Sequence, residues 1–112
     1  MAEDLPIETD CRSVQQKLRA QDDLLLLDCR EPDEWALVHI EGAHLLPMSE
    51  LAARVGEIEE YRDRPIVVHC HHGGRSLRVA RWLREQGFGQ AQSMAGGIDQ
   101  WALEIDRTLP RY

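Results

Sequence analysis

Three short aliphatic runs dominate the hydrophobic pattern of the chain. They occupy residues 24–28, 65–70 and, more weakly, 90–94. A strand with one face in water alternates apolar and polar residues, whereas the first two runs are apolar almost throughout. We therefore expect three buried strands, together with two shorter strands at residues 7–8 and 43–45.

The segments between these strands carry helix signals. Thr9 or Asp10 can cap a helix that reaches about Ala20, because either side chain offers an oxygen to the first free amides of a helix. Pro32 suits the first turn of a second helix, which we expect to continue through Val38.

Two more helical segments follow later in the chain. Residues 51–60 can hold one or two short helices interrupted at Gly56, and residues 75–86 place apolar side chains at three- and four-residue offsets before a stop at Gly87. Strands and helices therefore alternate along the chain. This order is typical of an α/β protein in which a mostly parallel sheet is covered by helices on both faces.

Composition limits the classes of protein that the chain can represent. Its 112 residues fit one domain, residues 1–112, and 43% hydrophobic with 29% charged residues is typical of a globular protein. The net charge of −7 disfavours a nucleic-acid partner, because it would repel phosphates. The longest aliphatic run is too short to cross a bilayer, and the acidic start lacks the features of a secretory signal. We expect a cytoplasmic protein with no membrane partner.

The cysteines suggest reactive chemistry at one position. Cys11, Cys29 and Cys70 are an odd number without repeated spacing, so a disulfide framework is not expected. Cys70 ends an apolar strand and is followed by a glycine-rich loop that leads into a helix. The other two cysteines lack such surroundings, and a structural role is preferred for both.

The loop after Cys70 is the main candidate site. Glycines can adopt positive φ angles and let successive backbone amides turn toward one point, which here is the sulfur. The helix N-terminus and the charge of Arg75 should both favour the thiolate over the thiol. The candidate catalytic residue is Cys70, and the candidate substrate-binding residues are His71, His72, Gly73, Gly74, Arg75 and Ser76.

Two other interpretations compete with the catalytic one. A lone cysteine at a strand end is usually a buried structural residue. The histidines at positions 69, 71 and 72 suggest a metal, but no Cys-x-x-Cys or distant histidine pair completes a set of four ligands, so no metal site and no cofactor are predicted. Asp28 and Arg30 are expected to support the loop from below as an ion pair.

Three motifs together resemble the rhodanese family of single-domain sulfurtransferases. Residues 27–35 with 39–44 look like the first signature of the family, residues 70–76 like its active loop, and residues 96–101 like its closing motif. The resemblance implies a rhodanese-like three-layer sandwich with a five-stranded, mostly parallel sheet. It also implies a persulfide on Cys70, formed from a small anionic sulfur donor such as thiosulfate or from a donor protein persulfide. The acceptor would be a thiol or cyanide.

Two alternatives remain open. The first is phosphatase or arsenate-reductase chemistry. Cell-cycle phosphatases of the same fold use a longer loop, with arginine six positions after cysteine, whereas Arg75 is five after Cys70. A smaller ring suits a single sulfur atom better than a tetrahedral oxyanion. A non-catalytic rhodanese-like binding module would more often lack the cysteine, which is present here. The loop also lacks the extra cations of thiosulfate-specialised members, which weakens the case for thiosulfate as the natural donor.

Overall fold

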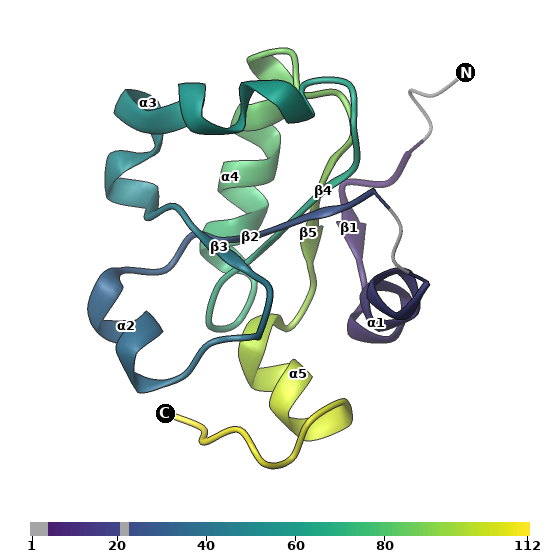
Figure 1. Cartoon of the computed structure of the whole chain (residues 1–112), viewed down its shortest axis with the longest axis vertical. Coiled ribbons are helices and arrows are strands. Elements are labelled where there is room, and N and C mark those ends of the chain that lie inside the picture. The colour runs from purple at the N-terminus through teal and green to yellow at the C-terminus, as the bar shows by residue number, and fades with distance from the viewer. Residues whose placement is uncertain (1–4, 21–22) are drawn as a thin grey trace.

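The computed structural model describes residues 5–20 and 23–112, which form a central sheet between layers of helices (Figure 1). All pairings among the five strands of this sheet are parallel, and their order is β1-β5-β4-β2-β3. The strands are β1 (Glu8–Thr9), β2 (Leu25–Asp28), β3 (His44–Leu45), β4 (Ile66–His69) and β5 (Ala91–Met94). The α/β class and the parallel sheet predicted from the sequence are confirmed.

Helices occupy the connections between the strands. They are α1 (Cys11–Arg19), α2 (Pro32–Leu37), the 3-10 segment η2 (Met48–Glu50), α3 (Leu51–Arg54), the 3-10 segment η3 (Val55–Tyr61), α4 (Gly74–Glu85) and α5 (Gly97–Glu104). None of the helices in the described part of the chain is long and apolar enough to cross a membrane.

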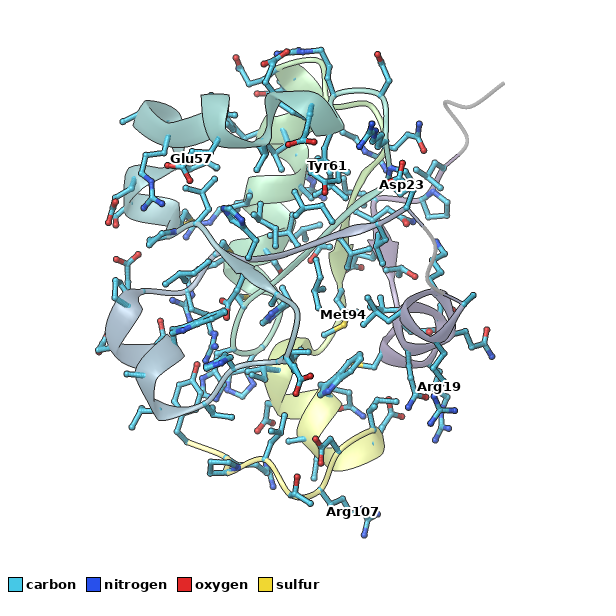
Figure 2. The ribbon with its side chains drawn as sticks, in the orientation of Figure 1. Arg19, Asp23, Glu57, Tyr61, Met94 and Arg107 are labelled. Atoms are coloured by element: carbon cyan, nitrogen blue, oxygen red, sulfur yellow. The ribbon has the colours of Figure 1, made fainter. Side chains whose placement is uncertain are left out.

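The sheet separates two apolar clusters. On one face, alternate residues of β2 and β4 such as Leu27 and Val68 pack against α3 and α4. On the other face, Leu26, Val67 and Met94 pack with α1 and α5. Figure 2 shows Met94 in the interior and charged side chains such as Arg19 at the periphery. Helices therefore cover both faces of the sheet, as predicted.

Local signals explain three of the helix boundaries. Asp10 caps α1, since its carboxylate accepts a hydrogen bond from the Ser13 amide at 2.7 Å. Pro32 begins α2, and Gly87 ends α4 with a φ of +98°. These three predictions are confirmed.

The structure corrects three other expectations. The break in residues 51–60 was expected at Gly56, but the helix changes type at Val55 and its non-helical backbone lies at Ile58, whose side chain is buried in the core. Helix α4 begins at Gly74, one residue earlier than expected. Helix α5 was not predicted from the sequence, because its eight residues are too few for a clear periodic pattern.

Candidate active site

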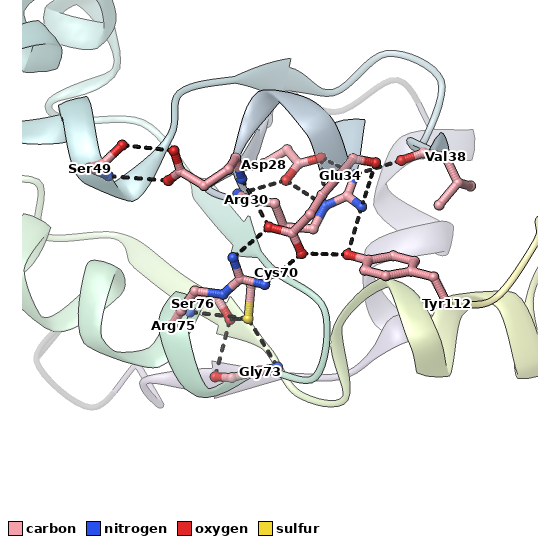
Figure 3. A network of polar contacts seen from close by, with 11 residues as sticks. Asp28, Arg30, Glu34, Val38, Ser49, Cys70, Gly73, Arg75, Ser76 and Tyr112 are labelled. Carbon is pink, nitrogen blue, oxygen red and sulfur yellow. Dashed lines mark hydrogen bonds and ion pairs between the residues drawn. The ribbon is translucent and has the colours of Figure 1, made fainter. Parts of the chain in front are cut away.

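The site lies where β2 and β4 end. Cys70 follows the last residue of β4, and the loop after it leads directly into α4. Cys70 is 1% exposed, and Figure 3 shows its sulfur facing the start of this helix. Ligand sites of parallel α/β sheets form at this carboxyl edge.

The sulfur of Cys70 accepts two backbone hydrogen bonds. The amide nitrogen of Gly73 lies 3.1 Å from Sγ, and that of Ser76 lies 3.3 Å away. Both amides belong to the N-terminal turn of α4, where free amides need an acceptor, and the capping residue Gly73 has no side chain to supply one. The sulfur therefore takes the place of a helix cap. The expected cradle of amides is present, with Gly73 at a φ of +109°.

A hydroxyl pair extends this network into the protein. The Ser76 hydroxyl oxygen lies 3.5 Å from Cys70 Sγ and 2.7 Å from the Ser93 hydroxyl on β5. All three side chains are buried. The Ser76 hydroxyl also donates to the Gly73 carbonyl at 3.2 Å. Once Cys70 is ionised, the Ser76 proton has the sulfur as a second acceptor, and Ser93 can donate to Ser76.

These contacts stabilise the ionised sulfur. The pKa of Cys70 falls from 9.0 to about 4, first because the Cys29 thiol hydrogen bonds to it, and further because of the Ser76 hydroxyl and the amides of Ser76 and Gly73. Burial opposes this shift but does not outweigh it. Cys70 is a thiolate at neutral pH, as a nucleophilic cysteine requires. The pKa of Cys29 is raised well above its ordinary range by the same hydrogen bond and by burial, so Cys29 remains a thiol.

Arg75 does not take the position expected of it. Its guanidinium donates two hydrogen bonds, at 2.7 and 2.9 Å, to the carboxylate of Glu34 on α2 (Figure 3). This ion pair holds the pKa of Glu34 at about 2. Arg75 therefore fixes α2 to the active loop, and the nearest stabilisers of the thiolate are neutral donors.

The two loop histidines lie near the C-terminal segment. The His71 ring stacks on Tyr112 with centroids 3.9 Å apart, and Nδ1 of His72 is 3.8 Å from an Asp99 carboxylate oxygen. Tyr112 in turn donates a hydrogen bond from its hydroxyl to Glu34. Gly74 is the first residue of α4, and space is open where its side chain would be.

Helix α5 anchors the loop from behind. The amide of Ile98 donates to the carbonyl of Cys70 at 2.8 Å, and that of Asp99 donates to the carbonyl of His71 at 3.1 Å. Gly97 has a φ of +61°, and a Cβ atom there would overlap both carbonyl oxygens. Gly97 of the closing motif therefore lets the helix approach the loop closely.

Asp28 and Arg30 form the predicted ion pair. Nη2 of Arg30 lies 2.6 Å from Oδ2 of Asp28, and both side chains are fully buried. Arg30 also donates to the Val38 carbonyl at 2.7 Å and to the Tyr112 hydroxyl at 2.9 Å. Multiple partners of this kind are needed for a buried charge. The pair joins β2, α2 and the C-terminal segment beside the site.

Sequence reasoning missed four members of the site. The sequence pattern predicts a structural role for Cys29 and no role at the site for Glu34, Ser93 or Tyr112. One signal could have found Cys29, because it directly follows the predicted strand 24–28, and Cys70 is the last residue of the predicted strand 65–70. Glu34 lies in the first signature motif, but nothing in that motif indicates its contact with Arg75, and Ser93 and Tyr112 carry no local motif of their own.

Comparison with known proteins assigns the chain to a family. The family model for the rhodanese-like domain matches residues 11–104. A protein named sulfurtransferase from Allochromatium vinosum is 39% identical over 95 residues, covering 85% of this chain and 87% of its own length. Thiosulfate sulfurtransferase GlpE of Pseudoalteromonas translucida is 35% identical, covering 85% and 89% respectively. The chain belongs to the rhodanese-like domain family.

Solved structures support the same fold. A rhodanese-related protein of Thermoplasma volcanium has a TM-score of 0.78 and 28% identity, covering 89% of this chain and 94% of its own. Other relatives are much longer. This chain spans 23% of a probable adenylyltransferase/sulfurtransferase of Mycobacterium tuberculosis.

Proposed function

We propose that the protein is a sulfurtransferase that carries sulfane sulfur as a persulfide on Cys70. The observation that carries this proposal is the buried sulfur of Cys70, which accepts amides from Gly73 and Ser76 and has a pKa of about 4. The names of the two sulfurtransferase relatives support the same reaction class.

The proposed reaction has two displacement steps. The Cys70 thiolate attacks the sulfane sulfur of a donor, so that a bond to Sγ forms and the sulfur–sulfur bond of the donor breaks. The donor leaves as sulfite if it was thiosulfate, or as a thiolate if it was a persulfide. A thiol or cyanide then attacks the outer sulfur, and the Cys70 thiolate leaves. A low pKa favours this second step, because a stable thiolate is a good leaving group.

The surroundings of Arg75 favour a persulfide over thiosulfate as the better donor. The guanidinium is engaged by Glu34 in a bidentate pair, so its charge is largely neutralised locally. Thiosulfate is a dianion and gains most from unpaired cations. The persulfide group of a thiol donor carries at most one negative charge and therefore depends less on them. We therefore expect faster loading from a small thiol persulfide than from thiosulfate at equal concentration.

Intact mass spectrometry tests the proposal. The reduced protein is incubated with thiosulfate or with glutathione persulfide, and loading should add about 32 Da, the mass of one sulfur atom. Cyanide should remove the adduct as thiocyanate. Cys70→Ser should show no adduct, whereas Cys11→Ser serves as the matched control and should load normally.

Two results would contradict the proposal. One is an adduct that persists in Cys70→Ser. The other is hydrolysis of an aryl phosphate by the unmodified protein at a higher turnover than its sulfur transfer, which would favour phosphatase chemistry on this fold. If Cys70 accepts no sulfur from either donor, the result favours a non-catalytic binding module instead.

A further inference from the structure

A second cysteine lies directly beside Cys70. The strands β2 and β4 are parallel neighbours in which Asp28 pairs with His69, so Cys29 and Cys70 are the next residues along each strand. The Cys29 amide donates to the His69 carbonyl at 3.1 Å, which continues the register past the strand ends. Because side chains alternate along a strand, both sulfurs face the layer that contains α4.

This geometry is compatible with a disulfide. Neighbouring strands lie about 4.8 Å apart, within the range of roughly 4.4 to 6.8 Å found between the Cα atoms of bridged cysteines. Each residue directly follows the last residue of its strand, and its carbonyl accepts one backbone hydrogen bond, from Met48 to Cys29 at 2.9 Å and from Ile98 to Cys70 at 2.8 Å. In the structure neither cysteine is part of a disulfide.

The two sulfurs differ in reactivity. Both are buried, but Cys70 is ionised and accepts hydrogen bonds from two amides, whereas Cys29 is a thiol. Peroxides react with thiolates rather than thiols, so the first oxidation is expected at Cys70. Cys11 lies in the cluster on the opposite face of the sheet and therefore cannot take part.

We propose that Cys29 is a resolving cysteine, which converts peroxide-oxidised Cys70 into a Cys29–Cys70 disulfide. In the first step the Cys70 thiolate attacks hydrogen peroxide, which forms the sulfenic acid and releases hydroxide. In the second step the Cys29 sulfur attacks Cys70 Sγ, a sulfur–sulfur bond forms, and the hydroxyl leaves as water with the Cys29 proton. A dithiol reductant returns both thiols and completes the cycle.

The contacts that keep Cys29 a thiol also make the second step depend on prior oxidation of Cys70. The pKa of Cys29 is raised chiefly by its hydrogen bond to Cys70, and then by burial. Oxidation removes the negative charge from Cys70, and with it the main obstacle to ionisation of Cys29. Cys29 should therefore become a nucleophile only after Cys70 has been oxidised.

The disulfide would block the nucleophile reversibly. It would also protect Cys70 from the irreversible sulfinic and sulfonic states. This inference concerns the thiol pair itself and does not depend on the sulfur donor or acceptor.

Thiol mapping tests the proposal. The reduced protein is treated with hydrogen peroxide in about twofold excess, then alkylated and weighed, and the disulfide should lower the mass by about 2 Da and leave one alkylated thiol. Nonreducing trypsin digestion should yield residues 20–30 linked to residues 63–75. Dithiothreitol should restore all three thiols.

Two variants make the test specific. Cys29→Ser should form no internal disulfide and should accumulate gains of about 32 or 48 Da on Cys70, with roughly tenfold less activity recovered by dithiothreitol than in the unmodified protein. Cys11→Ser should behave like the unmodified protein. Cys29→Ala provides a second variant if serine disturbs the core, and circular dichroism checks folding.

The proposal is overturned if the digest links no Cys29 peptide to a Cys70 peptide, or if Cys29→Ser and Cys29→Ala resist overoxidation as well as the unmodified protein does. Sulfur loading is measured separately on the reduced protein. A disulfide without loading would refute the sulfurtransferase proposal alone, and loading without a disulfide would refute this one alone.

Discussion

The lowered pKa of Cys70 should make protein stability depend on pH in a particular direction. The group ionises at about 4 in the fold, compared with 9.0 as the ordinary value. Between these two values the unfolded chain holds a proton on Cys70 that the folded chain has lost. The stabilisation from Cys70 is therefore complete above pH 9 and is lost as the pH falls toward 4.

The magnitude follows from proton linkage. One proton of difference gives a slope of about 1.4 kcal/mol per pH unit in the free energy of unfolding. Between pH 6 and pH 8 the contribution of Cys70 should therefore rise by about 3 kcal/mol. This is a large fraction of the stability of a small domain, which is about 5 to 15 kcal/mol.

Replacement of Cys70 by serine isolates this term. Serine does not titrate in this range, so Cys70→Ser should lack the slope while it keeps the contributions of every other titrating group. Urea unfolding at pH 6, 7 and 8 in the presence of a reductant measures both proteins. Their difference in free energy of unfolding should grow in favour of the unmodified protein as the pH rises. Parallel curves would refute the reasoning and would mean that Cys70 is protonated in the fold.

Three further variants test the supports of the site. Ser76→Ala should raise the pKa of Cys70 by about one unit, because a charged hydrogen bond of roughly 1.5 kcal/mol is lost. The rate of Cys70 alkylation as a function of pH measures this pKa, and Ser49→Ala is the control. Glu34→Gln should lower the free energy of unfolding by about 2 kcal/mol at neutral pH, since it weakens a partly buried bidentate pair. Glu34 has a lowered pKa, so its stabilisation is present above pH 4.5 and is lost as the pH falls toward about 2. The difference in free energy of unfolding between the unmodified protein and Glu34→Gln should therefore be smaller at pH 3 than at pH 6. An equal difference at both pH values would contradict the ion pair as its cause. Gly97→Ala should lower the free energy of unfolding by about 2 kcal/mol and reduce sulfur loading, because the φ of Gly97 is +61° and a Cβ there would displace the loop. Thermal unfolding and the loading assay measure both effects. Gly56→Ala, where space is open, is the control and should change neither by much.

The sequence alone predicted the parts of the site that depend on neighbouring residues. The apolar run before Cys70 and the glycines after it indicated a strand, a tight loop and a helix, and these place the sulfur at free amides. Asp28 and Arg30 are two residues apart and meet in the same turn, as expected. Hydrogen bonds and steric limits act over a few residues here, so the local sequence is sufficient to specify them.

Only the tertiary structure decided which distant residues contact Cys70 and the loop after it. Cys29 lies beside Cys70 because β2 and β4 are neighbours in a fixed register. Glu34 binds the guanidinium of Arg75 because α2 lies at the end of the sheet. Tyr112 stacks on His71 for a similar reason. Strand order and register come from the packing of the whole core, to which every strand contributes. No short motif encodes them, and so the charge of Arg75 was expected at the thiolate although the fold directs it to Glu34.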